Sequence, residues 1–175
     1  MRERTGLRCR AAGGGGTPAA RRTATARAGP AAGGRTRRSG RPGAAPIIRF
    51  KCVSAKATPA AVDELCLVYR HAIDQDRIPP LIAIGALILD FLCIHPFRDG
   101  NGRISRLLTL LALYQRGHEV GRYVSTERLI EDSREDYYDA LYRSSEGWHS
   151  GRHDLLPWLG YFLSIVRRAY LGFEE

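Results

Sequence analysis

The segment "IHPFRDGNGRISR", residues 94–106, brings together side chains that could handle a phosphate-containing substrate. Gly100, Asn101 and Gly102 stand at the start of a predicted helix, where unpaired backbone N–H groups and the helix dipole attract phosphate. Arg103 and Arg106, three residues apart, project from the same side of its first turn and can donate forked hydrogen bonds to phosphate oxygens. These features predict a binding site for a polyphosphate.

Two further residues of this segment indicate the kind of chemistry. Asp99 adds a carboxylate that suits Mg²⁺, because proteins usually hold this ion through one or two carboxylates together with substrate phosphates. His95 carries an imidazole, which exchanges protons near neutral pH and could accept a proton from an attacking hydroxyl. Each residue alone would also fit a helix cap, a turn or a solvent-facing position, but the combination favours a phosphate-transfer site that binds a nucleotide with Mg²⁺.

Helices must position these residues, since apolar side chains recur at helical spacing along most of the chain. The predicted helices cover residues 58–74, 81–94 (opened by Pro79 and Pro80) and 103–115, a fourth from Ser125 or Thr126 through Leu141, and a fifth that begins at Asp154. The second is apolar on nearly all sides and delivers His95 at its end. The stretch "IIRFKCVS" has the β-branched and aromatic content of a short strand. We therefore expect an all-α helical bundle with a short edge β-strand or hairpin.

Residues 1–46 differ in composition from the rest of the chain. They hold eleven arginines and a single acidic residue, so the net charge of +9 lies in this segment and the remainder is close to neutral. Ala, Gly, Arg, Pro and Thr dominate it, which predicts a disordered low-complexity tail before a folded domain at 47–175. Such a tail could be a basic arm, a transit peptide or a segment without a task of its own. Without interleaved aromatic residues it would bind nucleic acid only weakly and without sequence preference.

The cysteines and the apolar runs exclude several classes of protein. Cys9, Cys52, Cys66 and Cys93 show no regular spacing, so the sequence signals neither a zinc site nor a disulfide framework. The longest apolar run, residues 81–89, is too short for a membrane helix. We expect a cytoplasmic protein that does not bind membranes.

The stretch "HPFRDGNGRISR" resembles the signature of Fic-domain proteins, H-x-F-x-[DE]-[AG]-N-[GK]-R-x-x-R, at every defined position. Residues 78–97 and the segments "YVSTERLIEDSREDYYDAL" and "SSEGWHSGRHDLLPWLGYFL" are also similar to that family. The resemblance implies a Fic fold and a protein adenylyltransferase, which transfers AMP from ATP to a Ser, Thr or Tyr hydroxyl of a target protein.

The resemblance also implies roles for single residues. His95 would be the base that deprotonates the target hydroxyl, and Asp99 would hold the Mg²⁺ that bridges two phosphates. The anion hole would consist of Gly100, Asn101 and Gly102, while Arg103 and Arg106 would neutralise the outer phosphates.

Three further positions bear on the site. Phe97 looks like a core anchor of the loop, and Gly102 favours AMP transfer, because relatives that transfer the terminal phosphate carry Lys there. Tyr137 and Tyr138 stand where the family often places aromatic residues near adenine, although both could equally be bundle core.

The sequence departs from the family in two ways. The inhibitory pattern [ST]-x-x-x-E-[GN] is not found, since Tyr142 precedes Glu146 and Gly147 where Ser or Thr is required. The residues before Ile47 make a poor first strand for the hairpin that positions targets. The chain could thus be an unrestrained transferase, acting on itself or another protein, or an impaired Fic-fold fragment that serves as a binding or regulatory module. A partner antitoxin or inhibitory protein is left open.

Overall fold

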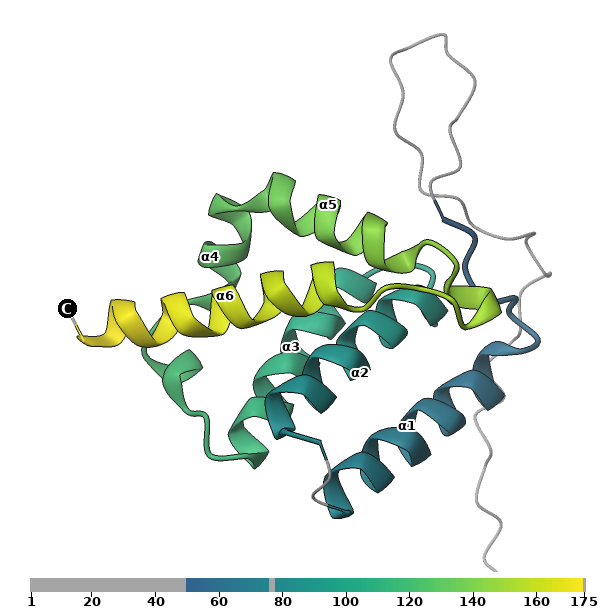
Figure 1. Cartoon of the computed structure of the whole chain (residues 1–175), viewed down its shortest axis with the longest axis horizontal. Helices are drawn as coiled ribbons and strands as arrows, with labels where there is room; N and C mark the ends of the chain where they lie inside the picture. Colours follow the sequence, from purple (N-terminus) through teal and green to yellow (C-terminus); the bar gives the residue numbers. More distant parts are fainter. Residues whose placement is uncertain (1–49, 76–77, 175) are drawn as a thin grey trace, which may run out of the picture. The chain divides into compact units, whose positions relative to one another are not determined.

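The computed structural model describes residues 50–75 and 78–174, and these residues form an all-helical fold (Figure 1). Two 3₁₀ turns, η1 (Val120–Arg122) and η2 (Trp148–Ser150), lie in the connections. The α-helices are α1 (Thr58–Asp74), α2 (Pro80–Ile94), α3 (Asn101–Gln115), α4 (Thr126–Asp132), α5 (Arg134–Ser145) and α6 (Leu156–Glu174). The predicted all-α class is confirmed.

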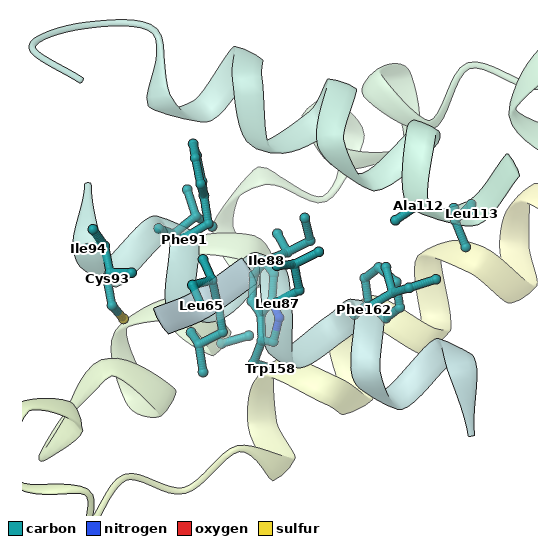
Figure 2. Close-up of a cluster of buried hydrophobic side chains, with 14 of the residues drawn as sticks. Leu65, Leu87, Ile88, Phe91, Cys93, Ile94, Ala112, Leu113, Trp158 and Phe162 are labelled. Atoms are coloured by element: carbon teal, nitrogen blue, oxygen red, sulfur yellow. The ribbon is translucent and has the colours of Figure 1, made fainter. Parts of the chain in front are cut away.

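Helix α2 is central, because α1, α3, α5 and α6 all pack against it. It begins after Pro79 with a second proline at its first position, where the missing N–H costs nothing. Its apolar residues are buried along almost the whole length, as expected for a helix without a polar face. Figure 2 shows this core, in which side chains of α1 (Leu65), α3 (Leu113) and α6 (Trp158, Phe162) surround those of α2.

Helix α6 approaches α2 closely at Gly85. A Cβ atom added there would lie 2.6 Å from Leu159 Cδ2, so a larger residue would push the helices apart. Trp158 Nε1 donates to the Gly85 carbonyl oxygen at 2.8 Å, and the Trp158 backbone N–H donates to Ser144 Oγ at 3.0 Å. These bonds fix the start of α6 against both α2 and α5.

The turn between α5 and α6 is fastened to α2 through Trp148. Its Nε1 donates to Asp90 Oδ1 at 2.7 Å, although the two residues are 58 positions apart in the sequence. Burial raises the pKa of the Asp90 carboxyl, while the bond from Trp148 and the nearby His153 act in the opposite direction. The C-terminal half is therefore held on α2, the helix that directly precedes His95.

The predicted fourth helix is two helices, which corrects the sequence-based expectation. The break is at Ser133, whose φ of −116° and ψ of 36° lie outside the helical region. Its hydroxyl donates to the Leu129 carbonyl oxygen at 2.7 Å and lies 3.0 Å from the Tyr161 hydroxyl. A serine side chain that bonds a carbonyl four residues earlier competes with the helical backbone, and here it lets α5 turn away from α4.

Other expectations concern the first part of the chain. The tail at 1–46 and residues 47–49 of the predicted strand lie outside the described residues. Within residues 50–54 only Lys51 has a bridge-type backbone pairing, and no strand forms there. Cys52, Cys66 and Cys93 are free thiols. In the described part of the chain, no helix has the length and apolar character needed to cross a bilayer.

Candidate active site

His95 follows the last residue of α2 in an uncommon backbone conformation. Its φ of 55° and ψ of 57° are left-handed, and among the described residues no other non-glycine has a positive φ. Pro96 explains why the helix stops, because a residue before proline is disfavoured in the right-handed helical region. The left-handed state costs a non-glycine residue roughly 1–2 kcal/mol, and such residues cluster at functional sites.

The ring of His95 is oriented by a backbone carbonyl. Nδ1 lies 3.3 Å from the Leu92 carbonyl oxygen, one turn earlier in α2. Because a carbonyl can only accept, this contact requires the hydrogen on Nδ1. In the neutral ring, Nε2 then carries the lone pair. The half-buried ring is thus arranged to accept a proton at Nε2.

Asn101 closes the loop between His95 and α3. The Phe97 N–H donates to Asn101 Oδ1 at 3.0 Å, and Asn101 Nδ2 donates to the Phe97 carbonyl oxygen at 2.7 Å. The asparagine is only 2% exposed. Its amide therefore holds the loop, and Asn101 can serve the predicted anion hole only through its backbone N–H.

Phe97 does not occupy the core position expected for it. The residue is 48% exposed, and its ring packs against the Phe91 ring with a centroid distance of 6.4 Å. The loop is fixed by the backbone of Phe97, which Asn101 binds on both sides. The expectation of a core anchor is therefore wrong, since the hydrogen bonds supply the fixation that was assigned to the ring.

The start of α3 is open and lies under two guanidinium groups. Gly100 precedes the helix with a φ of 84°, and in the described structure no side chain caps this end. A Cβ atom at Gly100 would lie 3.5 Å from Arg103 Nη2, and one at Gly102 would lie 3.6 Å from Arg106 Nη1. Both arginines therefore fold back over the glycines. Free N–H groups beneath two cations form a place for an anion.

Asp99 lies at the exposed edge of this helix start. Its Oδ2 is 3.5 Å from Arg103 Nη2, a solvent-facing ion pair that an incoming charged ligand can easily replace. Within the described residues there is no group of three or more His, Cys, Asp or Glu side chains that could hold a metal alone. Asp99 therefore suits Mg²⁺ only as a shared ligand, with substrate phosphates completing the coordination.

Arg106 has a partner that the sequence did not reveal. Its Nη2 lies 2.8 Å from Oε1 of Glu127, in the first turn of α4. Nothing in the sequence links these two positions, because the pairing depends on how α4 is placed by α6.

Tyr137 and Tyr138 have different surroundings. Tyr137 packs its ring against Trp158 and Tyr161, with centroid distances of 5.6 and 5.7 Å. It also lines a mostly apolar cavity of about 40 Å³ that Arg106 borders. Tyr138 does not line this cavity, and its ring lies 5.8 Å from the guanidinium carbon of Arg134. Tyr137 thus lines the same cavity as Arg106 of α3.

Comparison with known proteins places this loop in a known family. The model of the Fic/DOC family matches residues 19–113, more than half of the chain. The chain belongs to the Fic/DOC family. The matched region begins inside the segment expected to be a tail, so a domain start at residue 47 stays a prediction.

Solved structures of Fic proteins share the fold. A Fic family protein from Desulfovibrio desulfuricans aligns over 69% of this chain with 28% identity and a TM-score of 0.55. A Fic-domain-containing signaling protein from Bacteroides thetaiotaomicron aligns over the same share with 25% identity and a TM-score of 0.56. The alignments cover 34% and 47% of those two chains. The Fic fold expected from the sequence is confirmed, and Fic proteins are generally transferases, which indicates nucleotidyl transfer at the level of the family.

Proposed function

We propose that this protein is an adenylyltransferase that moves AMP from ATP to a Ser, Thr or Tyr hydroxyl of a target protein, which could be the chain itself. The observation that carries the proposal is the arrangement of one loop. The His95 imidazole has its lone pair on Nε2. A loop that Asn101 closes connects His95 to the start of α3, which two guanidinium groups cover. This arrangement offers a base and an anion site within a few residues.

The proposed reaction is a single displacement at the α-phosphorus of ATP. His95 Nε2 takes the proton of the target hydroxyl, and the oxygen then forms a bond to the α-phosphorus. The bond from that phosphorus to the bridging oxygen breaks, and pyrophosphate leaves with the electron pair. The N–H groups at the start of α3 and the two arginines stabilise the phosphate charge, so catalysis consists of placement and electrostatics.

The expected Mg²⁺ fits the residues in a limited way. Asp99 would hold it together with phosphate oxygens, since the described residues form no group of three or more His, Cys, Asp or Glu side chains that could hold a metal alone. When bound, the ion would neutralise negative charge on the substrate phosphates.

Gly102 favours transfer of AMP over transfer of the terminal phosphate. With no side chain there, the Arg106 guanidinium lies directly over the start of α3. A lysine, as in the relatives that transfer the terminal phosphate, would place a second cation in that space.

Mass spectrometry tests the proposal. The full chain is incubated with ATP, MgCl₂ and a cell lysate, and proteins are searched for a mass increase of one AMP on a hydroxyl side chain. His95→Ala should abolish the modification while nucleotide binding persists. The matched control is His71→Ala, which removes an exposed histidine of α1 and should leave the modification unchanged.

Two results would contradict the proposal. If His95→Ala still modified proteins at the wild-type level, His95 would not be the general base. A folded wild-type chain that binds ATP but modifies nothing would instead favour the binding-module alternative.

A further inference from the structure

The ion pair between Arg106 and Glu127 differs from four other ion pairs among the described residues. The other pairs link side chains three or four residues apart in sequence. This one joins α3 to α4 and has the shortest distance among them, 2.8 Å. The Arg106 side chain is 30% exposed, so solvent screens the pair less than it screens a fully exposed one.

The two ends of the Arg106 guanidinium have different surroundings. Nη2 faces Glu127, whereas Nη1 lies 3.6 Å from the place where a Cβ atom of Gly102 would be. Long side chains of a helix lean toward its N-terminus, which brings the guanidinium to the first turn of α3. One end is thus tied to α4, and the other lies over the proposed phosphate site.

Helix α4 gives Glu127 a defined position. Ser125 caps the helix, with its Oγ accepting from the Arg128 N–H at 3.2 Å. The helix packs on α6 and α5, while Thr126 and Ile130 line the cavity that Arg106 borders. The carboxylate is therefore held beside the arginine by its own element.

We propose that Glu127 is a positioning residue for Arg106, and the inference rests on the proposed function. Glu127 holds the guanidinium over the start of α3, with Nη1 directed to the outer phosphates of ATP. Without the carboxylate, the long arginine side chain is free to sample other rotamers, and ATP binding must then pay for fixing it.

The carboxylate also offsets part of the positive charge that attracts the phosphates. The two effects have opposite signs, so the change in affinity on removing Glu127 decides between them. The proposal predicts that the loss of positioning exceeds the gain in charge.

The experiment measures binding by calorimetry on the full chain. The probes are AMP and the α,β-methylene analogue of ATP, which cannot release AMP, each with MgCl₂. Glu127→Ala should lower the affinity for the ATP analogue about three- to tenfold, which corresponds to the cost of fixing one flexible side chain. AMP binding should not change, because AMP lacks the outer phosphates. Glu127→Gln keeps an oxygen that accepts from Arg106 and should restore most of the affinity.

Two further comparisons separate positioning from a general effect. Glu131→Ala is the matched control, since Glu131 lies on the same helix, is 72% exposed against 70% for Glu127, and pairs with Arg134. It should bind both probes as the wild type does. In the Arg106→Ala background, adding Glu127→Ala should cause no further loss, because Glu127 acts through Arg106.

Several outcomes would overturn the inference. They are unchanged or tighter binding of the ATP analogue by Glu127→Ala, an equal loss for AMP, and a further loss in the Arg106→Ala background. A wild-type chain that binds the ATP analogue no better than AMP would overturn the proposed function as well. A melting temperature equal to that of the wild type establishes for each variant that the fold is intact.

Discussion

Removing the Asn101 side chain should destabilise the loop that joins His95 to α3. Asn101→Ala deletes two hydrogen bonds to the Phe97 backbone, of 3.0 and 2.7 Å, at a residue that is 2% exposed. A hydrogen bond contributes about 1 kcal/mol net, so the variant should lose about 2 kcal/mol of unfolding free energy. For a chain of this size the melting temperature should fall by about 4–8 °C.

Asn101→Asp gives the sharper test because it keeps the shape. The introduced carboxylate can still accept from the Phe97 N–H, but its second oxygen replaces the amide that donates to the Phe97 carbonyl. Two acceptors would then face each other at about the hydrogen-bonding distance, so near neutral pH this variant should be at least as unstable as Asn101→Ala.

Lowering the pH should separate the two variants. A protonated carboxyl can donate to the Phe97 carbonyl, which favours the protonated form in the folded state. That stabilisation is present at low pH and is lost as the pH rises, so Asn101→Asp should gain stability relative to Asn101→Ala between about pH 7 and about pH 4. Chemical denaturation at several pH values measures this.

A control and two outcomes complete this test. Ser105→Ala removes a buried hydroxyl whose bond to the Gly102 carbonyl stays inside α3, and it should cost less, with no pH dependence. A loss below about 0.5 kcal/mol for Asn101→Ala would refute the reasoning, since two net hydrogen bonds are worth more. Wild-type stability of Asn101→Asp at neutral pH would refute it equally.

Further predictions concern backbone geometry and one partly buried acid. His95→Gly should be more stable than His95→Ala by about 1 kcal/mol in urea unfolding, because glycine adopts the left-handed conformation without penalty, and equal stabilities would contradict that geometry. Gly100→Ala should lower the unfolding free energy by roughly 1–2 kcal/mol, because Gly100 has a positive φ. Gly102→Ala should not, because its Cβ would make only an ordinary contact within a helix. The reverse order would contradict the described loop geometry. Burial raises the Asp90 pKa, so the stability due to its protonation is present below about pH 4 and is lost as the pH rises through the raised value. Asp90→Asn keeps an oxygen that accepts from the Trp148 Nε1, so its unfolding free energy should exceed that of the wild type by the largest amount near neutral pH. An increase in unfolding free energy that is equal at all pH values would count against this.

The sequence predicted those features that local chemistry determines. The first helix was placed at its observed bounds, because Thr58, Pro59 and the apolar spacing act within a few residues. The end of α2 at His95 also follows from local chemistry, since Pro96 disfavours continuation.

Features that depend on distant parts of the chain were not predicted. The break at Ser133 involves the hydroxyl of Tyr161, and the position of Glu127 beside Arg106 requires α4 to be placed by α6. The role of the Asn101 side chain was also missed, because spacing alone cannot show whether an amide faces a ligand or its own loop. For Phe97 the family resemblance suggested a core anchor, yet the residue is 48% exposed and hydrogen bonds to its backbone hold the loop instead.

The central claim is that the loop holding His95 presents the α-phosphorus of ATP to a hydroxyl. Incubation of the full chain with ATP that is radiolabelled at either the α- or the γ-phosphorus, with MgCl₂ and lysate, tests it most directly. The account predicts protein-bound label from the α-position alone, and none with His95→Ala. Label that comes from the γ-position, or transfer that persists without His95, would contradict it.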